Sequence, residues 1–219
     1  MIRNIIFDWS GTLVDDLPAV WRASNYVFRR AGVTELTLEE FRVEFCLPFH
    51  RFYDRFVPHI PLPQLELWFH SHFREVQDSV MELPHARDFL EFCRERRLRA
   101  FVLSTVHQDH FAVQSARTGF GAFFEKAYVA VFDKRQKIHE ILAQHALAPS
   151  ETLFIGDMQH DIETARHGGI HSCAVLTGYN SLEQLRASQP DAIVQHLREL
   201  REHLESNNLE LNAGQNHPR

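Results

Sequence analysis

Residues 4–12, Asn-Ile-Ile-Phe-Asp-Trp-Ser-Gly-Thr, join a short apolar run to an acidic residue and a glycine. The run from Ile5 to Phe7 has the length and composition of a strand that is buried on both faces. Asp8 follows directly, and Gly11 three residues later permits the tight turn needed to leave a sheet. Ligands of open parallel α/β sheets bind at the carboxyl ends of the strands, so Asp8 is expected to point into a binding crevice.

Similar apolar runs recur along the chain and predict the rest of the sheet. Segments with helical spacing lie between the later runs, and this alternation of strand and helix is typical of a parallel sheet with crossover helices. The fold class is therefore predicted to be α/β, with a doubly wound, Rossmann-like core. The runs cover residues 100–103, 127–132, 152–155, 172–176 and 192–194.

About 90 residues separate the first run from the second, far more than one crossover needs. The segment contains no convincing strand and has helical patterns, including a capping box at Thr37 and Glu40. We expect a core of residues 1–15 and 84–205, a helical cap of residues 16–83, and a flexible polar tail of residues 206–219. The cap has a stripe of aromatic residues that is expected to pack internally rather than to line a substrate cavity: Phe41, Phe45, Phe49, Phe52 and Phe56.

Two acidic residues follow another buried run, in Gly156-Asp157 and, four residues on, Asp161. Two carboxylates this close are unfavourable together unless a cation neutralises them, and Mg²⁺ prefers such oxygen ligands. The alternative is that both acids serve only to stabilise a helix N-terminus.

Two further strand ends carry residues that suit a phosphoryl group. Ser104 and Thr105 offer hydroxyl and backbone N–H groups that could cradle a phosphate. Lys134, on the first turn of the next predicted helix, could neutralise both a phosphoryl group and the Asp8 carboxylate.

The ordered set of Asp8-Trp9-Ser10-Gly11-Thr12, Ser104, Lys134 and Gly156-Asp157 with Asp161 resembles the haloacid dehalogenase superfamily, and within it the phosphoglycolate-phosphatase-like group. The resemblance implies that Asp8 attacks phosphorus to form an aspartyl-phosphate, which water then hydrolyses. It also implies Mg²⁺ bound by the Asp8 carboxylate, the Ser10 carbonyl and Asp157, with Asp161 as a ligand or a support.

By the same resemblance, Ser104, Thr105 and Lys134 hold the phosphoryl oxygens, and Lys137 is the alternative lysine. The implied substrate is a small phosphorylated metabolite whose identity the sequence does not specify.

Ser10 stands where most phosphatases of this superfamily have a second Asp, which protonates the leaving group and activates water. Phosphonoacetaldehyde hydrolases also lack that Asp, but they use a cap lysine, and none lies between Asp8 and Ser104. The haloacid dehalogenases proper carry Tyr at the position of Ser10 and use no metal. P-type ion pumps also lack the second Asp, but they need membrane-spanning segments. Ser10 therefore predicts slow turnover, a preference for good leaving groups, or a substitute base from His107, His110 or His160.

Composition limits the other possibilities. A net charge of -6 and a pI near 6.2 argue against a nucleic-acid backbone as partner. Three scattered cysteines, Cys46, Cys93 and Cys173, and the lack of a long apolar stretch or leader favour a cytoplasmic protein without disulfides or membrane spans. The sequence leaves the oligomeric state open. The competing functional hypothesis is a catalytically weakened relative that binds a phosphorylated ligand or a protein partner.

Overall fold

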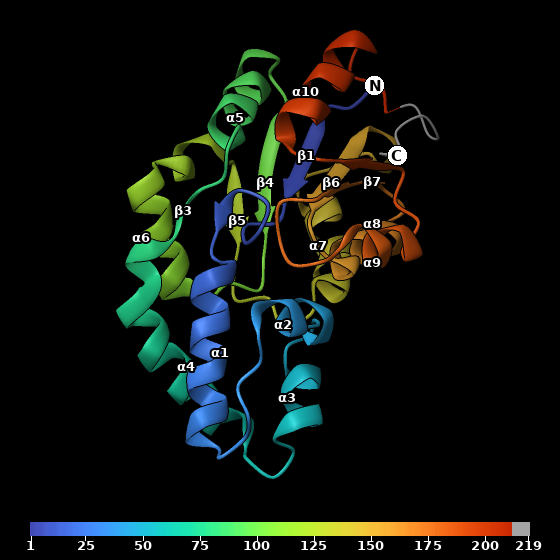
Figure 1. Ribbon diagram of the computed structural model, residues 1–219. Coiled ribbons are helices and arrows are strands. Elements are labelled where there is room, and N and C mark those ends of the chain that lie inside the picture. The colour runs from blue at the N-terminus through green and yellow to red at the C-terminus, as the bar shows by residue number, and fades with distance from the viewer. Residues whose placement is uncertain (212–219) are drawn as a thin grey trace.

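A parallel sheet of six strands, in the order β5-β4-β1-β6-β7-β8, forms the centre of the computed structural model, which describes residues 1–211 (Figure 1). β1 lies in the middle, paired with β4 on one side and β6 on the other. This order confirms the predicted doubly wound α/β class. The strands are β1 (Asn4–Phe7), β4 (Arg99–Leu103), β5 (Lys126–Tyr128), β6 (Thr152–Gly156), β7 (His171–Val175) and β8 (Ala192–Val194).

Helices cover both faces of this sheet. Ile5 and Phe7 of β1 pack in one layer, while Ile6 between them packs in the other, which explains why the strand is an unbroken apolar run. The first layer holds α5 (Ala86–Glu95), α6 (Gln108–Thr118) and α10 (Leu197–Ser206). The second holds α7 (Lys134–Gln144), α8 (Gln159–Gly168) and α9 (Leu182–Ala187).

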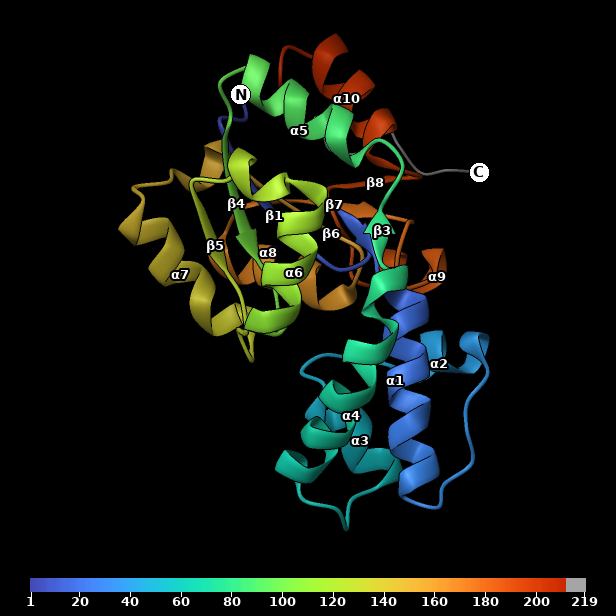
Figure 2. The ribbon, with the colours of Figure 1, turned by 90° about the vertical axis from the view of Figure 1, so that its left-hand side faces the viewer.

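Four helices form a separate layer beyond the carboxyl ends of the strands (Figure 2). They are α1 (Leu17–Arg30), α2 (Leu38–Glu44), α3 (His50–Phe56) and α4 (Leu62–Val76). The chain leaves the core through β2 (Val14–Asp15) and returns through β3 (Met81–Glu82), which pair antiparallel. Strands of two residues carry no readable alternation, so the sequence did not predict them. The division into a core of residues 1–15 and 84–205 and a cap of residues 16–83 stays a prediction.

The aromatic stripe has two roles in this layer. Phe41 and Phe52 are fully buried, as expected for internal packing. Phe45 and Phe49 instead line the cavity between the cap and the core. The capping box is confirmed, because Thr37 Oγ1 accepts a hydrogen bond from the Glu40 backbone and the Glu40 carboxylate accepts one from the Thr37 backbone.

The sequence-based boundaries differ from the structure by a residue at several strand ends and by more in two places. The run of residues 127–132 was predicted to be a strand throughout, but β5 ends at Tyr128, and Ala130 adopts a left-handed φ of 53°. The start of the expected tail is packed, because Leu209 accepts a hydrogen bond from the Ile2 backbone and contacts the core. Residues 212–219 lie outside the described residues.

Short 3-10 turns connect several of these elements: η1 (Gln77–Ser79), η2 (Phe120–Phe123) and η3 (Pro149–Glu151). Cys93 and Cys173 are buried, Cys46 is half-buried, and all three are free thiols. Within residues 1–211, every helix is too short or too polar to cross a lipid bilayer. The expectations of a cytoplasmic location and of no nucleic-acid partner stay predictions.

Candidate active site

Asp8 lies directly after β1, at the point where three neighbouring strands end. Its backbone N–H donates to the Ile155 carbonyl of β6, which fixes the start of the turn. The side chain is almost fully buried. Its Oδ1 accepts hydrogen bonds from the Trp9 backbone at 2.6 Å and from the Lys134 ammonium at 2.8 Å. Both donors contact the same oxygen, so neither of these contacts occupies Asp8 Oδ2.

Two other buried carboxylates lie beside Asp8. One oxygen each from Asp8, Asp157 and Asp161 lies within 4.8 Å of the others, an arrangement that could hold a metal ion. Asp157 accepts hydrogen bonds from the Thr12 hydroxyl at 3.1 Å and from the Tyr179 backbone at 2.7 Å. These contacts fix the orientation of the Asp157 carboxylate next to the carboxylates of Asp8 and Asp161.

Asp161 contacts the same Lys134 ammonium as Asp8 does. The Lys134 ammonium lies 2.7 Å from Asp161 Oδ1, and Asp161 Oδ2 accepts a hydrogen bond from the Met158 backbone at 3.0 Å. Because Asp161 Oδ1 pairs with an ammonium, whereas the Asp157 oxygens accept from a hydroxyl and a backbone N–H, Asp161 is better placed to position Lys134 and α8 than to bind a cation directly. The sequence grouped these residues correctly but left this difference open.

The electrostatics of the cluster fit a cation. Burial raises the pKa of Asp157 well above its ordinary value, and the charges of Asp8 and Asp161 raise it further. Burial also raises the pKa of Asp161 to about 6, although Lys134 opposes the shift. Burial alone would lower the pKa of Lys134, but Asp161 and Asp8 outweigh it and raise that pKa. Three carboxylates face one ammonium, so a bound divalent cation would balance the charge.

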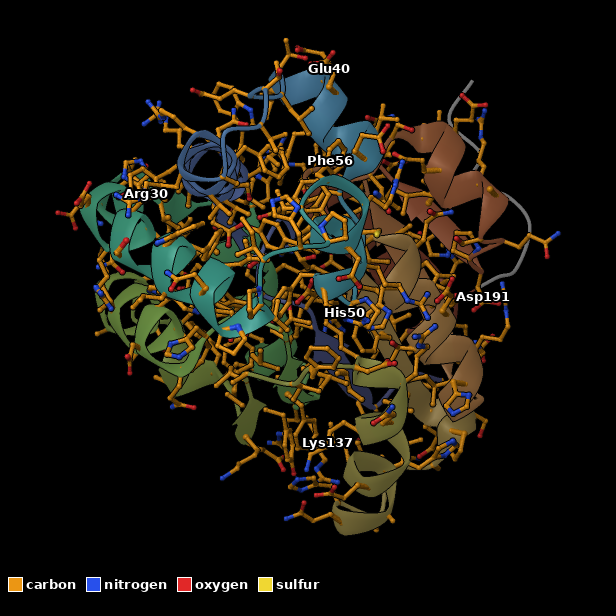
Figure 3. All side chains as sticks on the ribbon, turned by 90° about the horizontal axis from the view of Figure 1, so that it is seen from below. Arg30, Glu40, His50, Phe56, Lys137 and Asp191 are labelled. Atoms are coloured by element: carbon orange, nitrogen blue, oxygen red, sulfur yellow. The ribbon has the colours of Figure 1, made fainter. Side chains whose placement is uncertain are left out.

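Lys134, not Lys137, contacts Asp8. Lys134 is fully buried, whereas Lys137 lies one turn further along α7, at the periphery of the molecule, and pairs with Glu140 at 2.6 Å (Figure 3). Ser104 follows β4, the strand beside β1, and its hydroxyl accepts a hydrogen bond from the Val106 backbone at 3.3 Å. Thr105 follows Ser104 and lines the cavity above Asp8.

Residues 5–175 match the haloacid dehalogenase-like hydrolase family. The chain belongs to this family. It is 27% identical over 204 residues to a phosphoglycolate phosphatase of Synechococcus elongatus, covering 89% of this chain and 93% of the relative. It is 28% identical over 221 residues to a 5'-nucleotidase of Pseudomonas aeruginosa, covering 93% and 96%.

A solved structure has the same fold. The haloacid dehalogenase-like family hydrolase SP0104 from Streptococcus pneumoniae superposes with a TM-score of 0.80 at 24% identity, covering 93% of this chain and 98% of that one. The resemblance to phosphoglycolate-phosphatase-like members, and the assignment of the chain as a hydrolase, are thus confirmed.

In this haloacid dehalogenase-like hydrolase, Ser10 is held by an acid that the sequence analysis missed. The Ser10 hydroxyl donates a 2.6 Å hydrogen bond to Asp16 Oδ2, and the Tyr179 hydroxyl donates to Asp16 Oδ1 at 3.0 Å. Burial raises the pKa of the Asp16 carboxyl to about 7, against the effect of these two hydrogen bonds. The sequence feature that could have pointed to Asp16 is the acidic pair Asp15-Asp16, which follows the turn after β1.

A glycine on the loop after β7 was missed as well. A Cβ on Gly178 would lie 2.1 Å from Asp157 Oδ2, and one on Gly11 would lie 2.4 Å from the same oxygen. Gly11 also has a φ of +67°, as its turn was expected to require. Gly178 could have been predicted from the sequence, because binding sites lie where parallel strands end and Gly178 follows the end of β7 at Val175.

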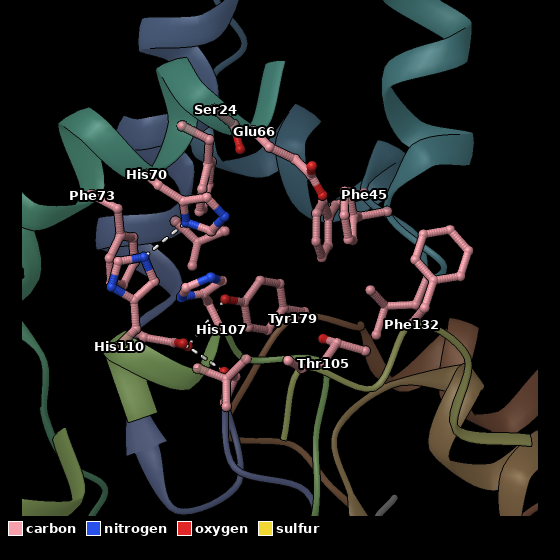
Figure 4. A pocket seen from close by; sticks show the side chains of 18 of the residues that line it. Ser24, Phe45, Glu66, His70, Phe73, Thr105, His107, His110, Phe132 and Tyr179 are labelled. Carbon is pink, nitrogen blue, oxygen red and sulfur yellow. Dashed lines mark hydrogen bonds between the residues drawn. The ribbon is translucent and has the colours of Figure 1, made fainter. Parts of the chain in front are cut away.

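A cavity of about 220 Å³ lies between the cap and the core, with Asp8 and Ser10 among its lining residues. Most of its wall is apolar or aromatic, with Phe45, Phe132 and Tyr179 on one side (Figure 4). The residues lining it, all within the described part of the chain, include Glu66 but neither Lys nor Arg.

The three histidines considered as substitute bases differ in position. His107 and His110 line the cavity. His160 does not: its Nε2 accepts a 3.3 Å hydrogen bond from the Lys134 backbone, and burial lowers its pKa to about 3. The sequence spacing could not separate these cases.

Proposed function

We propose that the protein is a Mg²⁺-dependent phosphatase of small phosphorylated metabolites and that Asp8 is its nucleophile. The observation that carries this proposal is the contact of Lys134 with Asp8 Oδ1 at 2.8 Å, inside a cluster with two further buried carboxylates. The names of the relatives, a phosphoglycolate phosphatase and a 5'-nucleotidase, support a phosphate ester as the substrate class.

Mg²⁺ would be held by the Asp8 and Asp157 carboxylates and the Ser10 carbonyl, with Asp161 supporting Lys134. A hard cation with oxygen ligands suits this donor set, and the cluster has the negative charge to balance it. When bound, the ion would neutralise part of the charge on the phosphoryl group.

In the proposed reaction, Asp8 Oδ2 attacks phosphorus in line with the leaving oxygen. A bond forms between Oδ2 and phosphorus as the bond to the leaving oxygen breaks, and water then hydrolyses the aspartyl-phosphate. Lys134 would hold a phosphoryl oxygen beside Asp8. Ser104 and Thr105, at the end of the neighbouring strand, would hold the remaining phosphoryl oxygens.

The leaving group would depart with little help from Ser10. While the Asp16 carboxyl is ionised, the Ser10 hydroxyl donates its single proton to it, so toward the substrate the Ser10 oxygen can only accept a hydrogen bond. General acid catalysis typically contributes about 10² to 10⁴ in rate. Its loss favours substrates whose leaving oxygen is stable without a proton.

The cavity wall points to an apolar leaving group. A second anionic group, such as the carboxylate of phosphoglycolate, would meet Glu66 and aromatic rings and find neither Lys nor Arg among the lining residues. We therefore propose apolar, preferably aromatic, phosphate monoesters as the preferred substrates.

The test is a panel of phosphate esters assayed with Mg²⁺, with and without EDTA, for the wild type and Asp8→Asn. We expect Mg²⁺-dependent release of phosphate, abolished in Asp8→Asn, with aryl phosphates turned over faster than alkyl phosphates and phosphoglycolate. Equal turnover of aryl and alkyl esters would contradict the proposed role of Ser10. Phosphoglycolate as the best substrate would contradict the argument from the cavity wall.

The second candidate function is a binding protein with weak catalysis, which the serine at position 10 favours. Beryllium fluoride with Mg²⁺ mimics the phosphorylated aspartate and separates the two. A Mg²⁺-dependent complex that raises the melting temperature supports the phosphatase, whereas no complex and no turnover across the panel supports the binder.

A further inference from the structure

Three histidines from two parts of the chain meet on one wall of the cavity. His70 belongs to α4 of the cap, His107 caps the N-terminus of α6 in the core, and His110 lies within α6. One ring nitrogen from each lies within 4.8 Å of the other two. His70 Nδ1 and His110 Nε2 are 2.9 Å apart, and Figure 4 shows the three imidazoles gathered opposite Phe132.

Two of these side chains, His70 and His110, are in the protonation state that binds metals. Burial lowers the pKa of His70 to about 4, and the neighbouring His107 lowers it further. Burial, together with the other two imidazoles, lowers the pKa of His110 to about 4 as well. Near neutral pH both rings are therefore uncharged and offer a nitrogen lone pair, the form in which histidine binds transition metals.

The spacing fits a tetrahedral ion after small adjustments. Metal–nitrogen bonds of about 2.0 to 2.1 Å place two imidazole nitrogens about 3.3 Å apart in a tetrahedral site. The 2.9 Å between His70 Nδ1 and His110 Nε2 is a hydrogen bond of close to this length, and its proton would move to the other nitrogen of its ring when an ion binds. Half-exposed His107 can approach by rotating. All three residues line the cavity, so a fourth coordination position would open into it.

The surroundings provide the support that metal-binding histidines usually have. The Phe73 ring lies 4.3 Å from the His110 ring, and Phe69 lies 5.4 Å from His70, which gives the rings an apolar setting. His107 Nδ1 accepts a 3.2 Å hydrogen bond from the Asp109 backbone; when Nε2 binds a metal the ring would turn, and its Nδ1 would then be protonated and face the Asp109 carboxylate, which lies 3.8 Å away. Carboxylates in this position orient metal-binding imidazoles and increase their basicity.

We propose that His70, His107 and His110 form a second metal site, for a transition-metal ion such as Zn²⁺, separate from the carboxylate cluster around Asp8. Imidazole ligands suit Zn²⁺ and its neighbours in the periodic table, whereas the carboxylates suit Mg²⁺. The ion would join α4 of the cap to α6 of the core and so hold the cap against the cavity. The proposal stands on the histidines alone and does not require the proposed phosphatase activity. With the ion bound, its open position would offer an anionic group a partner, so the substrate argument from the cavity wall applies to the protein without this second ion.

The test uses the full chain without a histidine tag, stripped of metal, with excess Mg²⁺ present to fill the carboxylate cluster. Co²⁺ is the probe, because four-coordinate Co²⁺ absorbs more strongly in the visible than six-coordinate Co²⁺. Zn²⁺ affinity then follows from displacement of Co²⁺. We expect one four-coordinate Co²⁺ per chain, and binding at least about tenfold weaker in His70→Gln and in His107→Gln.

The matched control is His139→Gln, which changes a histidine that pairs with His167 elsewhere, at 5.1 Å between rings. It should bind Co²⁺ like the wild type, and far-UV circular dichroism should show that all three variants fold. A metal-induced rise in melting temperature is expected for the wild type and His139→Gln but not for the other two. The proposal is overturned if Co²⁺ stays six-coordinate, or if binding survives unchanged in His70→Gln and His107→Gln.

Discussion

Replacing Lys134 by Met tests the charge balance of the active site most directly. Its ammonium is fully buried and lies 2.8 Å from Asp8 and 2.7 Å from Asp161. Methionine keeps most of the side-chain volume but leaves the buried carboxylates without a cation. Removing one partner of a buried ion pair typically costs about 3 to 5 kcal/mol. For a chain of this size, that corresponds to a fall in melting temperature of about 6 to 20 °C.

Lys137→Met is the matched control, since it changes the same residue type one turn along α7. Lys137 pairs with Glu140 at the surface, and such pairs contribute about 0 to 1 kcal/mol. Urea unfolding at pH 8 in EDTA should therefore show a large loss for Lys134→Met and almost none for Lys137→Met. Phosphatase activity should disappear only in the first variant.

Metal and pH provide two internal checks on this argument. Mg²⁺ should stabilise Lys134→Met more than the wild type, because more negative charge is left to neutralise. The loss should shrink at pH 5, where protonation of Asp157 and Asp161 relieves the repulsion. Equal losses for the two lysine variants, or a loss for Lys134→Met that is the same at pH 5 and pH 8, would refute the reasoning.

Three further outcomes are expected. Ser10→Asp should raise turnover of alkyl phosphates by about 10²- to 10⁴-fold, and further with Asp16→Asn, which removes the carboxylate beside the new acid; Ser10→Asn should give no gain. Asp157 and Asp161 have raised pKa values in the folded protein, so in EDTA their ionisation should lower the stability as pH rises above about 4, their pKa in the unfolded chain. The Mg²⁺-induced rise in melting temperature should therefore grow from pH 5 to pH 8, and a rise that stays constant would contradict this. Gly178→Ala should weaken Mg²⁺ activation at least about tenfold, because its Cβ would meet Asp157 Oδ2 at 2.1 Å, and unchanged Mg²⁺ titrations would contradict this.

The sequence predicted the residues that follow strands but not those that approach from elsewhere. Asp8, Ser104 and Asp157 each come directly after a buried apolar run, and parallel strands bring such positions to one edge of a sheet. Asp16 lies beyond the turn, and Tyr179 lies on a loop, so no periodicity relates either to Ser10. Their contacts depend on how the loops fold back, which is a tertiary effect.

The cap shows the same limit. Its helices could be predicted from spacing and from the capping box at Thr37. The sequence could not predict which aromatic residues face the cap interior and which face the cavity, because both sets occur at the same intervals of three and four. Phe41 lies within α2 and Phe45 directly after its end, yet the first is buried in the cap and the second lines the cavity. The meeting of His70 with His110 depends likewise on how the cap docks, and α4 has no sequence relation to α6.

Ser10 and the cavity wall restrict the substrate through independent effects. The wall selects by polarity, since burying an anionic or strongly polar leaving group against aromatic rings costs free energy. Ser10 selects by basicity, since an oxygen that leaves without a proton must be stable as an anion. A phenolic oxygen, with an ordinary pKa of about 10, meets this requirement far better than an alkyl oxygen with a pKa near that of water, about 15.7. Because an aromatic ester satisfies both conditions, the loss of the usual acid at position 10 and the apolar lining of the cap can belong to one specialisation of the site.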